Sequence, residues 1–267
     1  MKISISAFCF AGAILAFPSG VSAAVLVQDN FDGYADQAAF VAAWPQVGAT
    51  ASGTLSTTNP SSSPNSINYA TTTQRNEKVF SESGTVSSTN VLIFSFDFFD
   101  SNAALNPYRQ FANLQDSLAP ASSGQLVSMG LNNNQVSTDS GGNYYMGRIL
   151  GYTPTGDAGA AAGSYFKLNL PGAPLRSTGW HNLSVAISDV DFKFYVDGIL
   201  SEVVPQGAFA LRSYDVVRLG SGLTATASAN FDNVSITTVV PEPLGGGLAL
   251  AGIGLLALGR RRPGCPT

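Results

Sequence analysis

Short segments in which apolar and polar residues alternate recur along most of this chain, and they limit the folds that are open to it. A period of two places one side of each segment in a core and the other side in solvent, which is typical of a β-strand. Turns rich in Gly, Asn and Ser separate the segments. Many short strands of this kind favour a sandwich or barrel, and we predict an all-β, two-sheet antiparallel β-sandwich. The expected strands are Val25–Gln28, Ser66–Ala70, Val91–Phe99, Arg109–Leu114, Gln125–Leu131, Tyr144–Leu150, Ser164–Leu170, His181–Ser188, Phe192–Val196, Val216–Leu219 and Ala229–Thr237.

Several of the expected strands carry an apolar stripe that is clear enough to assign which side faces the core. Val91–Phe99 is the strongest single strand, because its alternate phenylalanines share one side. Further along the chain, Trp180–Ile187 and Phe192–Val196 each carry an apolar stripe with a period of two. Asp197-Gly198 then predicts a tight hairpin into Ile199–Val204, because Gly takes a positive φ without strain. Trp180–Ile187, Phe192–Val196 and Ile199–Val204 together predict a three-stranded meander.

One helix is expected, over Ala35–Ala43. Phe40 and Trp44 are four residues apart, so a helix would place them on one side. We expect Trp44 and Trp180 to be anchors of the core.

Charge is scarce in the segment Ala24–Val239. It has three Lys and six Arg against thirteen Asp and three Glu, a net charge of −7. Such a segment lacks the clustered cations of a nucleic-acid-binding surface, so we expect no nucleic-acid partner. The two cysteines, Cys9 and Cys265, lie outside this segment. Its stability must therefore come from packing and hydrogen bonds rather than a disulfide.

The first 23 residues have the layout of a signal peptide. Lys2 supplies a positive start, Ile3–Phe17 is apolar, and Val21-Ser22-Ala23 is a small-residue cleavage site. We predict export and cleavage by signal peptidase after Ala23. The alternative is an uncleaved N-terminal anchor.

Residues 240–267 combine three features in a fixed order. Pro241-Glu242-Pro243 comes first, the uncharged apolar run Leu244–Gly259 follows, and Arg260, Arg261 and Arg262 end it. As a helix the run would be roughly 24 Å long, which crosses a bilayer only with thinning or snorkelling. The arginines oppose translocation, so they would stay in the cytoplasm. We predict a transmembrane helix over 244–259.

This layout resembles the PEP-CTERM sorting tail of Gram-negative bacteria that make extracellular polysaccharide. The resemblance implies recognition by an exosortase-type membrane protease that cuts near Pro241-Glu242-Pro243. One departure from the family is the extension Pro263–Thr267 after the arginines. The alternative is an ordinary C-terminal membrane anchor.

The middle of the chain carries a second resemblance. Gly179–Val185, then Phe194-Tyr195-Val196-Asp197-Gly198, then Phe231–Ile236 and the opening Asp29–Gly33 resemble the concanavalin A-like (laminin G-like) jelly-roll superfamily. That fold implies two packed antiparallel sheets whose first and last strands lie near each other. We assign residues 24–239 to this domain. A galactose-binding-like jelly roll is the nearest rival.

A calcium site is the best metal hypothesis. Calcium binds six to eight oxygens from carboxylates, amides and carbonyls. Asp29 and Asp32 follow the first strand, with Asn30 between them, and Asp232 and Asn233 lie in the last strand. If the two strands are neighbours, Asp29, Asp32 and Asp232 could converge on a structural Ca²⁺. The alternative is that these side chains cap turns.

Sugar binding on a β-sandwich commonly uses exposed aromatic rings beside polar side chains. The candidates are Tyr144, Tyr145, Tyr152, Tyr108 and Arg109, which lie near loops rich in Asn, Gly and Ser. The alternative for each tyrosine is a half-buried strand residue.

No catalytic residues are expected. Retaining glycosidases need two carboxylates about 5–5.5 Å apart, and Glu77 and Glu82 are spaced to face opposite ways on a strand. The single histidine, His181, begins an expected core strand and is interpreted as structural.

These features predict an exported, non-catalytic protein that binds or organises extracellular polysaccharide. The tail would hold it briefly in the membrane before it reaches the cell surface or extracellular matrix of a Gram-negative bacterium. The alternatives are a structural or adhesion protein of the matrix without a sugar site, and a divergent glycoside hydrolase or lyase.

Overall fold

The computed structural model describes residues 23–240 except 118–125, 134–142, 155–161 and 207–212. The predicted sorting tail from Pro241 onward, including the helix expected at 244–259 and the Arg cluster, lies outside the described residues. So does the predicted signal peptide up to Ser22. The described part of the chain contains no helix with the length and apolarity that crossing a bilayer requires.

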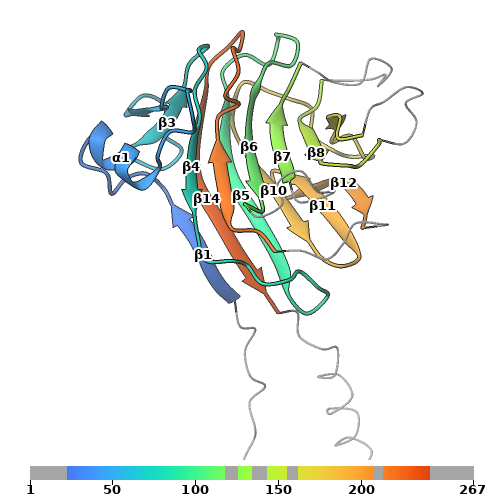
Figure 1. The fold of residues 1–267 in the computed structure, drawn as a ribbon. Coiled ribbons are helices and arrows are strands. Elements are labelled where there is room, and N and C mark those ends of the chain that lie inside the picture. The colour runs from blue at the N-terminus through green and yellow to red at the C-terminus, as the bar shows by residue number, and fades with distance from the viewer. Residues whose placement is uncertain (1–22, 118–125, 134–142, 155–161, 207–212, 241–267) are drawn as a thin grey trace, which may run out of the picture. The chain divides into compact units, whose positions relative to one another are not determined.

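Within the described residues the chain forms fourteen strands and one short helix (Figure 1). Their bounds are β1 Ala23–Asp29, α1 Gln37–Ala43, β2 Thr54–Ser56, β3 Ser66–Tyr69, β4 Asn76–Val79, β5 Val91–Asp100, β6 Gln110–Gln115, β7 Leu126–Leu131, β8 Met146–Ile149, β9 Phe166–Lys167, β10 Gly179–Ile187, β11 Asp191–Val196, β12 Ile199–Pro205, β13 Val216–Leu219 and β14 Ala229–Val239.

The strands form two antiparallel sheets. The eight-stranded sheet has the order β12-β11-β10-β5-β14-β3-β2, and β1 also pairs with β14. The six-stranded sheet has the order β4-β13-β6-β7-β8-β9. Apolar residues of both sheets belong to one buried core. The prediction of an all-β, two-sheet antiparallel sandwich is therefore confirmed.

Strand β5 sets the register of the eight-stranded sheet. Its residues alternate between half-buried and buried along its whole length, with Phe94, Phe96 and Phe98 fully buried. The strand pairs with β10 on one side and with β14 on the other. The predicted meander β10-β11-β12 is confirmed, and its Asp197-Gly198 turn has positive φ at both residues.

Aromatic rings join the two sheets across the core. Phe98 of β5 packs against Tyr145, just before β8, with the ring centroids 6.1 Å apart. Phe194 of β11 packs against Phe166 of β9 at 5.6 Å. Edge-to-face pairs of this kind add to the free energy gained by burial alone.

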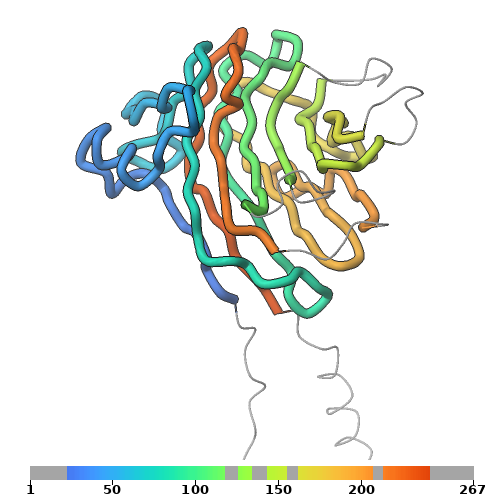
Figure 2. The backbone as a smooth tube through the Cα atoms, in the orientation of Figure 1, coloured from blue at the N-terminus to red at the C-terminus, as the bar shows by residue number. Residues whose placement is uncertain are grey.

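The first and last strands are neighbours, as the jelly-roll resemblance implies (Figure 2). β3 pairs with the first residues of β14, and β1 pairs with the later ones. Between them β14 bulges, and Asn233 takes a φ of 48°. The bulge therefore lies where β14 changes partners.

The predicted helix is confirmed, and one of the two tryptophan predictions is wrong. Asp36 caps α1, and Phe40 and Trp44 are fully buried. Trp180 is only half-buried and packs on Phe99, with ring centroids 5.4 Å apart. The alternation of β10 explains this. Leu183, Val185 and Ile187 face the core, so Trp180, an odd number of residues away from each of them, lies on the outer side.

A buried ion pair closes one end of the sandwich. Arg176 and Asp100 have side chains with no exposed surface, and Arg176 Nε lies 2.8 Å from Asp100 Oδ2. The Tyr108 hydroxyl donates to Asp100 Oδ1 at 2.8 Å, and Arg176 also donates to Asn143 Oδ1 and the Leu105 carbonyl. Each charge thus has several partners, which a buried ion pair needs to offset its desolvation.

We predict that Arg176→Met lowers the free energy of unfolding by about 3–5 kcal/mol, because it leaves the Asp100 carboxylate buried and unpaired. The double variant Asp100→Asn/Arg176→Met should lose less than this, since the amide keeps an acceptor for Tyr108 and removes the charge. Urea unfolding of both proteins measures the difference. Equal losses in the two variants would show that the buried charge is not the cause.

Candidate functional site

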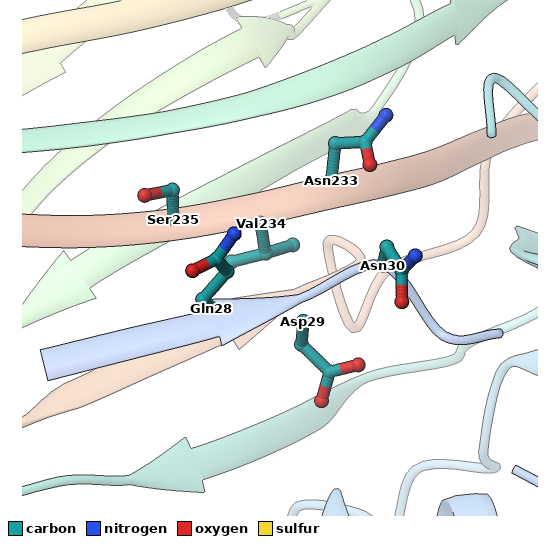
Figure 3. Close-up of a pocket in the computed structure, with 6 residues that line it drawn as sticks. All are labelled: Gln28, Asp29, Asn30, Asn233, Val234 and Ser235. Atoms are coloured by element: carbon teal, nitrogen blue, oxygen red, sulfur yellow. The ribbon is translucent and has the colours of Figure 1, made fainter. Parts of the chain in front are cut away.

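A pocket of 350 Å³ lies between β1 and β14, and of the three predicted calcium ligands only Asp29 lines it (Figure 3). Gln28, Asp29, Asn30, Asn233 and Ser235 line this pocket. Figure 3 shows the Asp29 carboxylate pointing away from Asn233 and Ser235. The strand alternation of β1 explains this direction, because adjacent residues face opposite sides.

Asp29 instead binds α1 and β4 to the first strand. Its Oδ2 accepts hydrogen bonds from the Tyr34 hydroxyl at 2.5 Å, from Trp44 Nε1 at 2.8 Å and from Lys78 Nζ at 3.1 Å. Burial of Asp29 raises its pKa, but the hydrogen bonds from Tyr34, Trp44, the Phe31 amide and Lys78 outweigh this and hold the pKa below its usual value. The carboxylate is therefore charged, and both of its oxygens accept hydrogen bonds from the protein.

The other two predicted ligands also have protein partners. Asp32 Oδ1 accepts from the Asn65 amide at 2.9 Å. Asp232 Oδ2 accepts from the Ser61 and Ser62 amides, both at 2.9 Å, while burial keeps the pKa of Asp232 above its usual value. The described residues contain no group of three His, Cys, Asp or Glu side chains that could hold a metal ion. The structure therefore does not bring the three predicted ligands together, and it gives them the capping role that was the alternative.

Two of the predicted sugar-stacking tyrosines are not exposed, and this corrects their assignment. Tyr108 is 1% exposed and Tyr145 is fully buried. Their hydroxyls donate to Asp100 and to the Ser177 carbonyl, respectively. The polar loops on either side suggested an exposed position, but these rings fill the end of the core.

The remaining candidates are half-buried. Tyr152 packs on Phe166 with ring centroids 5.5 Å apart, and Tyr144 lies just before β8. Arg109 donates its Nε to Asn133 Oδ1 at 2.7 Å. Of the predicted sugar-binding residues, Arg109 lines a groove on the six-stranded sheet.

That groove has a volume of 590 Å³ and lies on the outer side of the six-stranded sheet. β6 forms its middle: Ala112 and Leu114 belong to the core, so the alternation turns Phe111, Asn113 and Gln115 outward. Asn113 and Gln115 are nevertheless only 5% and 3% exposed. Amide side chains are thus sheltered on a sheet surface that faces away from the core.

Strand register places a row of polar side chains on the outer side of the six-stranded sheet, and three of them, Arg218, Asn113 and Arg148, line the groove. Arg218 of β13 lies opposite Asn113 of β6, Asn113 lies opposite Ser128 of β7, and Ser128 lies opposite Arg148 of β8. Glu77 of β4 continues the row beyond Arg218. Directly opposed residues in antiparallel strands are neighbours, so this row is continuous.

Hydrogen bonds fix the members of this row. Arg218 Nε pairs with Glu77 Oε2 at 2.8 Å, and Ser128 donates to Asn113 Oδ1. Arg148 donates its Nε to the Gly163 carbonyl at 2.6 Å. The row is therefore pre-ordered, which lowers the entropy cost of binding a ligand.

Among the described residues that line the groove, Tyr165 has the one buried side-chain polar atom that makes no hydrogen bond. It is 4% exposed, and its hydroxyl makes no hydrogen bond to a described residue. The ring packs on Phe111, with centroids 5.4 Å apart, and lies 5.6 Å from Arg148 Cζ. Burial raises the pKa of Tyr165 to about 12, and the neighbouring side chains of Ser128, Arg148 and Asn132 offset part of this rise. The hydroxyl is a neutral group that lacks a partner.

Of the residues that line this groove, only Arg109 was predicted from the sequence. The groove's four arginines are residues 75, 109, 148 and 218, which nothing in the linear order connects. The local signal is the alternation Phe111-x-Asn113-x-Gln115. It indicates that these residues share one side of the strand, but it does not predict that this side is sheltered from solvent.

The residues considered for catalysis have structural partners. His181 Nδ1 lies 2.8 Å from Asp197 Oδ2, and its Nε2 contacts Ser177. Glu77 pairs with Arg218, and Glu82 accepts a hydrogen bond from Ser213.

Comparison with known proteins finds similarity of fold but no family. No family model matches the chain, and no curated protein matches it. The chain is similar to the solved structure of cellulose induced protein Cip1, with 16% identity over 79% of this chain and 96% of that one, at a TM-score of 0.48. It is also similar to the ligand-binding domain of botulinum neurotoxin serotype D, solved with N-acetylneuraminic acid (10% identity, 75% of this chain, TM-score 0.45), and to a sialidase (13% identity, 79% of this chain, TM-score 0.45). The match spans 44% of the toxin chain and 18% of the sialidase chain.

We predict that Asp29 makes stability depend on pH in the acid range. Its pKa is lower in the folded protein than the usual value of 3.8, so its contribution is fully present above that value and is lost as the pH falls through the folded-state pKa. Asp29→Asn should lower stability at neutral pH and flatten its dependence below about pH 4.

Thermal unfolding followed from pH 7 to pH 2 measures both effects. Asp36→Asn is the matched control, because Asn caps α1 as well as Asp does and should leave neutral-pH stability nearly unchanged. An unchanged pH profile in Asp29→Asn would contradict the role given to Asp29.

Proposed function

We propose that this protein is a non-catalytic polysaccharide-binding protein that holds a glycan chain in the groove on the six-stranded sheet. The observation that carries the proposal is the row Arg218, Asn113, Ser128 and Arg148, sheltered beside the unpaired Tyr165 hydroxyl. For the fold family we propose the concanavalin A-like jelly roll, which the adjacency of β1 and β14 supports.

The chemistry of the groove suits sugar hydroxyls. Amides such as Asn113 and Gln115 both donate and accept hydrogen bonds, as a hydroxyl does, while guanidinium groups donate only. Groups held in place by the sheet lose little freedom when a ligand binds. The row crosses several strands, so it suits an extended chain better than a single sugar.

A hydrolase is the weaker candidate for this groove. Its described lining residues include no carboxylate, whereas glycoside hydrolysis needs a pair of them. A structural or adhesion protein of the matrix without a sugar site remains the alternative that absence of binding would favour.

For localisation we propose export and sorting. Residues 1–23 would be removed by signal peptidase, and residues 240–267 would be recognised by an exosortase-type protease. The protein would then reside at the cell surface or in the extracellular matrix of a Gram-negative bacterium.

We predict that Tyr165→Phe weakens polysaccharide binding about two- to tenfold without lowering stability. The variant removes only a hydroxyl that has no protein partner. Binding is measured by affinity electrophoresis of the full-length chain in gels that contain a panel of polysaccharides, and reducing ends are assayed in parallel.

Tyr108→Phe is the matched control. It removes a hydroxyl that donates to the buried Asp100, so it should cost stability by about 1.5–3 kcal/mol and leave binding unchanged. Failure of every polysaccharide to bind would favour the adhesion alternative, and newly formed reducing ends would favour the hydrolase. Equal binding by the wild-type protein and Tyr165→Phe would remove the groove from the proposal.

We also predict that the mature protein begins after Ala23 and ends near Pro241-Glu242-Pro243. Intact-mass spectrometry of protein from the native envelope or culture medium measures both termini. A mass that retains residues 244–267 would favour an ordinary membrane anchor over the sorting tail.

A further inference from the structure

The arginines of the domain are concentrated in one place. The described residues contain five arginines, and Arg75, Arg109, Arg148 and Arg218 all line the groove on the six-stranded sheet. The fifth, Arg176, is buried with Asp100. The described lining of the groove contains no Asp or Glu, although the whole chain has a net charge of −4. The groove is therefore a local cationic site on an acidic protein.

Only one of these four charges has a carboxylate partner among the described residues. Arg218 is paired with Glu77, whereas Arg109 and Arg148 donate to the neutral oxygens of Asn133 and Gly163. A neutral acceptor orients a guanidinium without cancelling its charge. Within the described residues, no carboxylate competes with a ligand for Arg109 or Arg148.

The positive charges also act on one another. Arg75 donates to the carbonyls of Gly220 and Ser221, and its pKa is lowered by burial and by the charge of Arg218. Like charges held together in a sheltered site repel, and an anion between them relieves that repulsion.

The spacing of the row favours a repeating anion rather than a single one. Arg218 and Arg148 are three strand spacings apart, which is roughly 14 Å, with Asn113 and Ser128 between them. One carboxylate cannot contact both ends of this row. A chain that carries an acidic group on successive sugars can, and its hydroxyls would lie over Asn113, which lines the groove between the two arginines.

Tyr165 adds a neutral donor beside Arg148. Its buried hydroxyl lacks a partner, and an unsatisfied buried hydroxyl is costly. A carboxylate or sulfate bound by Arg148 would supply the missing acceptor.

We propose that the groove binds an anionic polysaccharide, whose acidic groups pair with Arg148 and Arg218 while its hydroxyls bond to the amides between them. This inference rests on the proposed function, since it names the class of glycan for the same groove. Arginine suits this task because its planar donors bind a carboxylate or sulfate with two parallel hydrogen bonds.

The test compares polygalacturonate with its methyl ester, because the two share a backbone and differ in charge. Affinity electrophoresis of the full-length chain should show binding to polygalacturonate and at least tenfold weaker binding to the ester. Arg148→Gln and Arg218→Gln should each weaken polygalacturonate binding by about tenfold or more. Arg148→Lys, which keeps the charge but not the planar donors, should lose less.

Lys193→Ala is the control for the overall charge, because it removes a cation from β11 of the other sheet. It should bind as the wild-type protein does. Circular dichroism and urea unfolding establish that each variant is folded. Dextran sulfate against dextran forms the second arm: binding to dextran sulfate without binding to polygalacturonate would assign the acidic group to a sulfate ester.

The outcomes separate this inference from the proposed function. Detectable binding that is equal for polygalacturonate and its ester, and equal for dextran sulfate and dextran, would overturn the anionic class and leave glycan binding intact. Polygalacturonate binding that survives both Arg variants would overturn the site. Absence of binding to both charged and neutral polysaccharides by the folded wild-type protein would overturn the two proposals together.

Discussion

The structure depends on burial of the aromatic side of β5. Phe94, Phe96 and Phe98 are fully buried, and β5 is paired along its length with β10 and β14. A shift of one residue in either pairing would move an apolar side chain into solvent, so burial sets the register of the sheet. The same rule turns Asp97 and Phe99 outward, and it determines which side of each strand is available for function.

The groove follows from this rule in the opposite sheet. Because Ala112 and Leu114 enter the core, Asn113 must face outward, and pairing with β13 and β7 sets its neighbours. Arg218 and Arg148 reach the same floor from strands that are distant in sequence. The site is thus a consequence of register, held in place by the packing beneath it rather than by a dedicated motif.

The acidic side chains that were predicted to bind calcium have structural roles instead. Asp29 joins β1 to α1 and β4 through Tyr34, Trp44 and Lys78. Sequence analysis correctly placed such residues beside neighbouring strands, but proximity of strands did not settle the direction of each side chain. The same limit applied to Tyr108 and Tyr145, whose polar flanks predicted exposure although both rings fill the core.

Local patterns in the sequence were enough to predict the fold class, the strands with a clear alternation, the hairpin at Asp197-Gly198 and the helix that buries Phe40 and Trp44. These depend on local periods and turn chemistry, which act over a few residues. Strand pairing in the folded domain is what brings Arg75, Arg109, Arg148 and Arg218 into one groove and leaves Trp180 outside the core. Such outcomes depend on which strands pair and in which register, and the free energy that selects a register comes from burial in the whole sandwich rather than from any one segment.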